Sequence, residues 1–273
     1  MIPAPFDYAR ARSAEEAIAA LAEHGDEAKL LAGGMSLLPL MKLRLATPAV
    51  LVDVGRVREL SYVRDAGQHI EVGALTRHRD LETSEVLAEH CAPLRTVAGE
   101  VGDNQVRHRG TIGGSVSHGD PASDLPALLL ALDAVFVAQG PAGERTVSAT
   151  EFFRGFLETV LEPDELLTEI RVPKTTGVGF SYQKFQRRAQ DWAIVGAMAV
   201  RNGSTRIALV NMGGTPVRAV AVEEALAGGA SVEEAAEHAA DGTEPPGDIN
   251  ATPEYREHLA RVLVRRALEA AAG

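Results

Sequence analysis

Cysteine is nearly absent from this 273-residue sequence, in which Cys91 is the only one. A single thiol cannot form an internal disulfide, and it cannot hold an iron–sulfur cluster, which needs about four thiolate ligands. Cys91 has no obvious histidine or aspartate partner, so we interpret it as a packing residue and not as a nucleophile. Any iron–sulfur centre that serves this protein must therefore belong to a partner.

Long apolar runs are missing as well. No stretch approaches the roughly 20 apolar residues that a membrane span needs. The first seven residues, Met1 to Asp7, lack the basic and apolar regions of a signal peptide. We therefore expect a cytoplasmic protein.

Positive charge is in deficit, with 27 lysine and arginine residues against 38 aspartate and glutamate residues. The formal net charge is −11, and no stripe of lysine and arginine interrupts that balance. Such a chain repels a phosphate backbone, so nucleic acids and anionic membranes are poor candidates as partners.

Two familiar nucleotide-binding patterns are also absent, namely the Walker A sequence and the Rossmann glycine fingerprint. No internal repeat of fixed period is present either. Hydrophobic residues make up 45% of the chain, which is enough to fill the core of one large domain or two ordinary ones.

The first 130 residues predict mixed α and β structure. Residues 106–120 are expected to form loops because they are rich in glycine, histidine and arginine and lack helical periodicity. Asp120-Pro121 is expected to open a buried helix with proline at its first position. The other predicted elements are a helix at 14–24 after a capping box that begins at Ser13, a strand at 28–32, a helix at 37–43, strands at 50–54 and 70–74, and mostly helical structure at 81–99.

The rest of the chain predicts a domain boundary near residues 174–177 and an α+β domain after it. Asn202-Gly203 is a turn signal between two of its strands. The predicted elements are a hairpin of 134–138 with 144–147, strands at 166–172, 179–185, 193–201 and 205–212, and helices at 219–227, 231–239 and 253–271.

Two glycine segments are the main candidates for a binding site. Gly33-Gly34-Met35-Ser36 and Thr111-Ile112-Gly113-Gly114-Ser115 combine glycines, which allow close backbone approach, with hydroxyl groups and free N–H groups. Each could be a plain tight turn. Together they could hold one extended ligand that carries two phosphates.

Several polar residues have two interpretations each. Asp124 could accept hydrogen bonds from the hydroxyls of a ribose or ribityl chain, or could simply lie near a helix N-terminus. His108 and His118 lack a third ligand at metal spacing, so we expect loop histidines that form hydrogen bonds. Lys184, with Arg187, Arg188, Asp191 and Trp192, could place a cation near a cofactor ring or form a solvated, ion-paired strand end.

These segments resemble a known family. Residues 31–38 (Leu31-Ala32-Gly33-Gly34-Met35-Ser36-Leu37-Leu38) and residues 111–115 with 120–126 (Asp120-Pro121-Ala122-Ser123-Asp124-Leu125-Pro126) are similar to the two FAD loops of the xanthine dehydrogenase and aerobic carbon monoxide dehydrogenase flavoproteins. The order of the loops agrees. The resemblance extends to Pro5-Phe6-Asp7-Tyr8, to residues 169–173 and to residues 184–192.

The resemblance implies an α+β fold with two domains. Residues 1–176 would form an FAD-binding domain of the vanillyl-alcohol-oxidase-like (PCMH) type, with subdomains at about 1–55 and 56–176. Residues 177–273 would form a C-terminal α+β domain with an antiparallel sheet and helices, of the carbon monoxide dehydrogenase flavoprotein type.

The resemblance also implies which residues bind the cofactor, and that no residue is catalytic or binds a metal. Ala32, Gly33, Gly34, Met35 and Ser36, with Thr111, Ile112, Gly113, Gly114 and Ser115, would wrap the FAD pyrophosphate. Asp124, Val101, Leu166 and Lys184 would lie on or near the cofactor. Relatives often carry a polar residue at the position of Met35, which puts a side-chain contact there in doubt. No residue of this chain would be catalytic, and none would hold a metal.

In this family a large subunit with a molybdenum–pterin cofactor oxidises the substrate, and a small subunit carries two [2Fe–2S] clusters. The chain would be the medium subunit, whose FAD passes electrons to an external acceptor, in a dimer of heterotrimers. Two rivals are a self-sufficient FAD-dependent oxidoreductase with its own pocket and a cofactor-free scaffold subunit. Substrates of such complexes include carbon monoxide, purines, aldehydes and N-heterocycles, and the choice lies in the large subunit.

Overall fold

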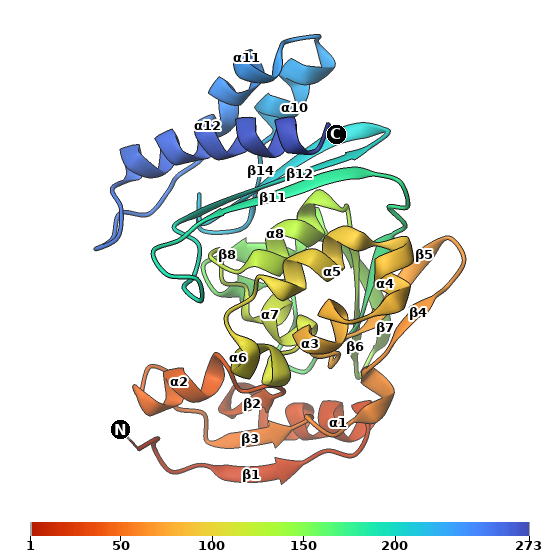
Figure 1. The fold of residues 1–273 in the computed structure, drawn as a ribbon. Helices are drawn as coiled ribbons and strands as arrows, with labels where there is room; N and C mark the ends of the chain where they lie inside the picture. The colour runs from red at the N-terminus through yellow and green to blue at the C-terminus, as the bar shows by residue number, and fades with distance from the viewer. Residues whose placement is uncertain (1, 273) are drawn as a thin grey trace.

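The computed structural model describes residues 2 to 272. Its three larger sheets follow one another from the N-terminal to the C-terminal end of the chain (Figure 1). The first sheet is parallel, in the order β1-β3-β2. Its strands are β1 (Asp7–Arg10), β2 (Ala28–Leu31) and β3 (Val50–Asp53). The helix α1 (Ala14–His24) covers it, and the short helices η1 (Gly25–Glu27) and α2 (Leu37–Lys42) lie on either side of β2 in sequence.

The apolar face of α1 explains why this first unit folds. Ala14, Ala17, Ile18 and Leu21 recur at helical spacing and are buried against the strands, in a small core of their own. Ser13 caps the helix by accepting a hydrogen bond from the N–H of Glu16. The expected capping box is incomplete, because the Glu16 carboxylate accepts from the N–H of Arg12 instead.

The second sheet is antiparallel, in the order β4-β5-β10-β6-β7. The central strand, β10, contributes to two cores. Leu166 at its start packs in the small N-terminal core, whereas Leu167, Ile170 and Val172 pack in the main core. The strands are β4 (Val63–Asp65), β5 (His69–Gly73), β6 (Val135–Gly140), β7 (Gly143–Ser148) and β10 (Leu166–Pro173), with η2 (Arg58–Leu60), α9 (Ala149–Phe152) and the hairpin of β8 (Phe153–Gly155) and β9 (Glu158–Thr159) attached.

Six helices connect β5 to β6: α3 (His78–Glu82), α4 (Glu85–His90), α5 (Ala92–Gly99), α6 (Asn104–Arg109), α7 (Ile112–His118) and α8 (Asp124–Ala131). All eight residues of α8 are buried, as its apolar sequence predicts. Cys91 is a free, fully buried thiol between α4 and α5, which confirms that it packs in the core.

The expectation of loops at residues 106–120 is wrong, because α6 and α7 occupy most of that stretch. The glycines lower the helix propensity of this sequence, but Ile112 and Val116, four residues apart, are both fully buried and hold α7 in place. The helix expected to open at Asp120-Pro121 begins instead at Asp124, because Asp120 accepts a hydrogen bond from the N–H of Ala122 and forms a turn.

The third sheet is antiparallel and follows the chain order β11 (Gly179–Phe185), β12 (Val195–Asn202), β13 (Ser204–Val210) and β14 (Val217–Arg218). Alternate residues of β12 face opposite ways, so Ala197 and Ala199 pack in the C-terminal core whereas Met198 and Val200 pack in the main core with α8. The face of this sheet that carries Ala197 and Ala199, away from α8, is covered by helices (Figure 1). They are α10 (Val220–Ala227), α11 (Val232–Ala236), η3 (Glu237–Ala240) and α12 (Pro253–Ala270).

The observed architecture agrees with the predicted α+β class and with the predicted strands and helices of the C-terminal part. Within residues 2 to 272, none of the helices combines the length and the apolar character that crossing a lipid bilayer requires.

Candidate functional site

A cavity of about 640 Å³ lies where the three sheets meet. Its volume is within the range of roughly 300–1,000 Å³ that is usual for small-molecule and cofactor sites. With one exception, all the residues predicted for the site line this cavity. The lining residues among them are Ala32, Gly33, Gly34, Met35, Ser36, Val101, Thr111, Gly113, Gly114, Ser115, Asp124, Leu166 and Lys184. Ile112 is the exception, because its side chain is fully buried in the main core.

The two glycine segments touch each other at one wall of this cavity. A Cβ atom added to Gly33 would lie 2.3 Å from the carbonyl oxygen of Arg109 and 2.9 Å from Cα of Gly110, so only glycine permits this approach. A Cβ atom added to Gly114 would lie 4.0 Å from Cβ of Ala32. Residues separated by about 80 positions in the sequence therefore form one continuous surface.

The first glycine segment has free backbone donors. None of the described residues accepts a hydrogen bond from the backbone N–H groups of residues 33 to 36. Gly34 has a φ of +76°, a conformation that side chains rarely adopt. Four consecutive amides that line a cavity without a protein acceptor suit an anionic or strongly polar ligand.

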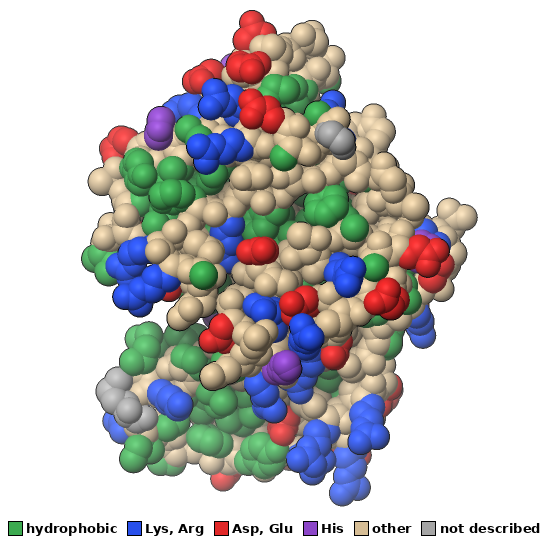
Figure 2. All heavy atoms as spheres, in the orientation of Figure 1, with side chains coloured by type: hydrophobic (Ala, Val, Ile, Leu, Met, Phe, Trp, Pro, Cys, Tyr) green, Lys and Arg blue, Asp and Glu red, His purple; other side chains and the backbone are tan. Residues whose placement is uncertain are grey.

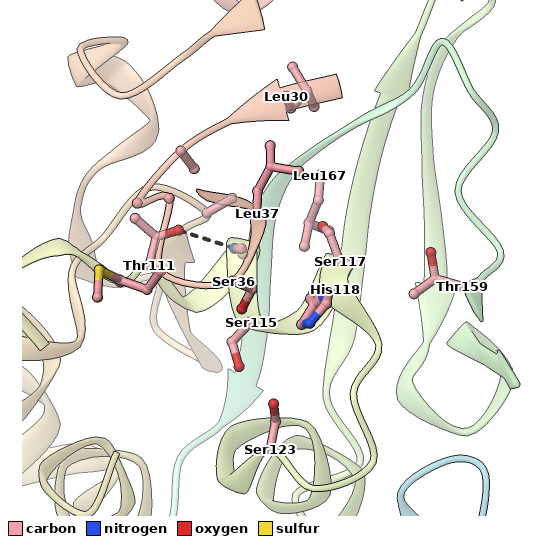
Figure 3. A pocket seen from close by; sticks show the side chains of 18 of the residues that line it. Leu30, Ser36, Leu37, Thr111, Ser115, Ser117, His118, Ser123, Thr159 and Leu167 are labelled. Atoms are coloured by element: carbon pink, nitrogen blue, oxygen red, sulfur yellow. Dashed lines mark hydrogen bonds between the residues drawn. The ribbon is translucent and has the colours of Figure 1, made fainter. Parts of the chain in front are cut away.

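The second glycine segment is built differently, as the first turn of α7. Thr111 is the N-cap and accepts a hydrogen bond from the N–H of Gly114 at 3.1 Å (dashed line in Figure 3). The N–H groups of Ile112 and Gly113 donate to the carbonyl oxygens of Thr76 and Ala74, at 3.1 and 2.8 Å. The segment offers the cavity the close approach of Gly114 and the hydroxyl of Ser115, while most of its amides are already paired.

A buried group of three polar side chains forms another wall. The Nζ atom of Lys184 lies 2.8 Å from Oδ2 of Asp124, and the side chains are 6% and 7% exposed. The hydroxyl of Tyr182 donates to Oδ1 of Asp124, and Nζ of Lys184 also donates to the carbonyl oxygen of Glu100 at 2.9 Å.

Burial dominates the electrostatics of this group. It raises the pKa of the Asp124 carboxyl, and the neighbouring ammonium of Lys184 opposes that shift. The pKa of Tyr182 is raised well above its usual value, by burial first and then by the Asp124 charge. Tyr182 therefore stays a neutral donor that holds Asp124 in place.

Two histidines line the cavity, His78 and His118, and only His118 was among those considered from the sequence. His118 lies in α7 and is half-buried in the cavity wall, close to Ser115 and Ser117 (Figure 3). His108 lies in α6, is exposed and does not line the cavity. Both were expected to be loop residues that form hydrogen bonds, but both are helical, and neither imidazole ring has a hydrogen-bond partner among residues 2 to 272. His78, at the start of α3, lines the cavity and is 4% exposed.

His78 and Tyr182 were not among the residues predicted from the sequence. For Tyr182 a signal existed, because it lies two residues before Lys184 on β11 and hence on the same face of the strand. His78 gave no signal, since its position depends on a contact with Gly110, 32 residues later. In the Lys184 cluster, Arg187 and Asp191 form a partly exposed ion pair at 3.8 Å, and Trp192 lines the cavity.

Comparisons with known proteins cover the whole chain. A family profile described as "FAD binding domain in molybdopterin dehydrogenase" matches residues 4–175, and one described as "CO dehydrogenase flavoprotein C-terminal domain" matches residues 180–271. The carbon monoxide dehydrogenase medium chain of Hydrogenophaga pseudoflava is 43% identical, over 99% of this chain and 98% of the relative. That of Afipia carboxidovorans is 39% identical over the same shares.

A solved structure agrees with these sequence matches. Carbon monoxide dehydrogenase from Hydrogenophaga pseudoflava contains a chain that superposes on this one with a TM-score of 0.96 and 44% identity, over 100% of this chain and 99% of that chain. The predicted resemblance and fold class are thereby confirmed. The chain belongs to the family of FAD-binding domains of molybdopterin dehydrogenases, joined to a C-terminal domain of the carbon monoxide dehydrogenase flavoprotein type.

Proposed function

We propose that this chain is the FAD-carrying electron-transfer subunit of a molybdenum hydroxylase complex, most like the medium subunit of carbon monoxide dehydrogenase. The observation that carries the proposal is the cavity at which both glycine segments meet, with four unpaired amides on one side and the buried Asp124–Lys184 pair on another. An extended ligand with a pyrophosphate and a polyhydroxylated chain needs both kinds of wall.

The residues present fit FAD. The amides of residues 33 to 36 would donate to the pyrophosphate, with Ser115 as a further donor. Asp124 would lie near the hydroxyl chain, and Ala32, Val101 and Leu166 supply apolar contacts. Bound FAD supplies the electron-accepting and electron-donating chemistry, and the chain binds it, orients it and controls its access to water.

The electron donor and the substrate chemistry would be in partner subunits. The single, buried cysteine excludes an iron–sulfur cluster held by this chain alone. We therefore propose a small [2Fe–2S] subunit as the donor to FAD and a large molybdenum–pterin subunit as the site of substrate oxidation, assembled as a dimer of heterotrimers. A cytoplasmic location and a domain division after residue 176 remain parts of the proposal.

The surface has a region suited to such partners. Hydrophobic side chains gather on the N-terminal part of the molecule, in the region that holds α2 (Figures 1 and 2). Leu43 and Leu45 are 54% and 73% exposed, and Met35, which lines the cavity, is 38% exposed. An apolar surface beside a cofactor cavity is typical of a protein–protein contact.

The test begins with the visible absorption spectrum of the purified chain and chromatographic identification of the cofactor released on denaturation. We expect a flavin spectrum with FAD near one per chain, and neither iron nor molybdenum. Absence of flavin, even after addition of FAD, would contradict the proposal and favour a scaffold subunit.

A second measurement tests the partners. The complex isolated through a tag on this chain should contain molybdenum and iron in addition to FAD, and its substrate oxidation should reduce the flavin. A flavin-loaded chain that oxidises an organic substrate without any partner would instead favour a self-sufficient oxidoreductase.

A further inference from the structure

His78 is held at the junction of the two glycine segments. Its backbone N–H donates to the carbonyl oxygen of Gly110 at 3.0 Å, and the preceding residue, Arg77, pairs with Thr111 in a β-bridge. The ring edge of His78 lies against Gly110, because a Cβ atom added to that glycine would be 2.6 Å from Cδ2 and 2.8 Å from Nε2. Gly110 in turn touches Gly33.

The two ring nitrogens of His78 have different surroundings. Nδ1 is sealed from solvent and has no hydrogen-bond partner within residues 2 to 272. Nε2 also has no partner among the described residues, but it is not sealed, and the residue lines the cavity. The unsealed nitrogen is therefore the one available to a ligand.

The ring is neutral near pH 7. Burial first, and then the charges of Arg107 and Arg77, lower its pKa to about 4. A neutral imidazole carries one N–H. A hydrogen on Nδ1 would be a buried donor without an acceptor, which proteins avoid more strictly than an unused lone pair. The hydrogen therefore belongs on Nε2.

We infer that His78 is a further cofactor-binding residue, whose Nε2–H donates a hydrogen bond to a pyrophosphate oxygen of bound FAD. The inference rests on the proposed function. The expected acceptor is the pyrophosphate and not the flavin, because the imidazole edge of His78 lies where Gly33 and Gly110 touch, beside the unpaired amides of residues 33 to 36. A neutral donor adds direction there without adding another charge next to Arg77.

The test compares variants that keep or remove the donor. His78→Gln can place an amide N–H near the position of Nε2, whereas His78→Met has a similar length and no donor. Dissociation constants would be measured on the full flavin-free chain for FAD, for ADP, which carries the pyrophosphate, and for riboflavin, which has no phosphate.

We expect His78→Met to weaken FAD and ADP binding by about ten-fold, the size of one hydrogen bond to a charged group. His78→Gln should stay within about three-fold of the wild type, and riboflavin affinity should not change in either variant. Should His78→Met fail to fold by circular dichroism, His78→Asn replaces it, because its shorter side chain places the amide near Nδ1.

Three results would overturn the inference. Unchanged FAD and ADP affinity without the donor would make His78 a packing residue only. A loss for riboflavin without a loss for ADP would place the ring against the flavin part of the ligand. Failure of the wild-type chain to bind FAD at all would overturn the proposed function as well, so the two failures are distinguishable.

Discussion

At the scale of single residues, the adjacent glycines of α7 have different constraints. A Cβ atom at Gly113 would lie 2.5 Å from Cβ and 2.6 Å from the carbonyl oxygen of Ala74, whereas at Gly114 the only atom closer than 4.0 Å is Oγ1 of Thr111, at 2.7 Å. Gly113 is required for packing. Gly114 keeps space free on the side of the cavity.

We therefore expect Gly114→Leu to fold but to retain no FAD, because the new side chain occupies ligand space. Gly113→Val should lose about 1–3 kcal/mol of unfolding free energy through overpacking. Circular dichroism and urea unfolding measure the fold, and absorbance measures the flavin. Normal flavin content in Gly114→Leu would refute the assignment of this segment to the cofactor.

The Asp124–Lys184 pair has a structural role that must be separated from cofactor binding. Asp124→Ala leaves a buried ammonium without its partner, which should cost about 3–5 kcal/mol of unfolding free energy. The double variant Asp124→Ala/Lys184→Met removes both charges and should recover most of that loss. FAD affinity should stay low in the single and the double variant, and lower than in His118→Ala. A double variant with normal FAD affinity would show that the pair serves stability alone.

The buried, neutral ring of His78 should make the stability of the flavin-free chain depend on pH. Its folded pKa of about 4 is below the value of about 6.5 expected in the unfolded chain, so the unfolded state takes up a proton first as the pH falls. The stability contributed by the neutral ring is complete above pH 6.5 and is lost between pH 6.5 and 4, by roughly 3 kcal/mol. Between pH 7 and pH 4.5, urea unfolding should show a smaller loss of unfolding free energy in His78→Gln than in the wild type. Equal losses in the two proteins would count against a buried neutral His78.

At the scale of elements, most of the fold could be predicted from the sequence because local patterns and tertiary packing agree. Helix 14–24, its Ser13 cap, the strands and the Asn202-Gly203 turn are examples. The stretch around α7 could not, because glycine propensity opposes a helix that the burial of Ile112 and Val116 imposes. The residues predicted for the site include the glycines that line the cavity, whereas the contact of His78 with Gly110 joins residues 32 positions apart and has no local signal.

The N-cap of α7 tests how much of this helix depends on local interactions. Thr111→Ala removes the acceptor for the N–H of Gly114 and should lower the unfolding free energy by about 1 kcal/mol. Thr111→Ser keeps the hydroxyl and should be nearly neutral. Urea unfolding of the three proteins decides the matter, and equal stability of the alanine and serine variants would mean that packing alone holds α7.

At the scale of the whole molecule, the cavity joins parts of the chain that otherwise have separate cores. Its wall includes Leu30 of β2, Leu167 of β10 and Trp192, which follows β11. The small N-terminal core and the C-terminal core share no residues, and only the main core lies between them. A ligand in the cavity contacts all three sheets or the segments next to them.

FAD should therefore stabilise the entire chain and not one part of it. A ligand that binds only the folded state adds about 2.7 kcal/mol to the unfolding free energy when its free concentration is 100 times the dissociation constant. We expect thermal unfolding followed by circular dichroism to shift upward with FAD as a single transition, while Gly114→Leu, which cannot hold the ligand, should not shift. If FAD raised only one of two separate transitions in the wild type, the cavity would belong to one part of the chain, and the bridging role that its lining residues predict would be wrong.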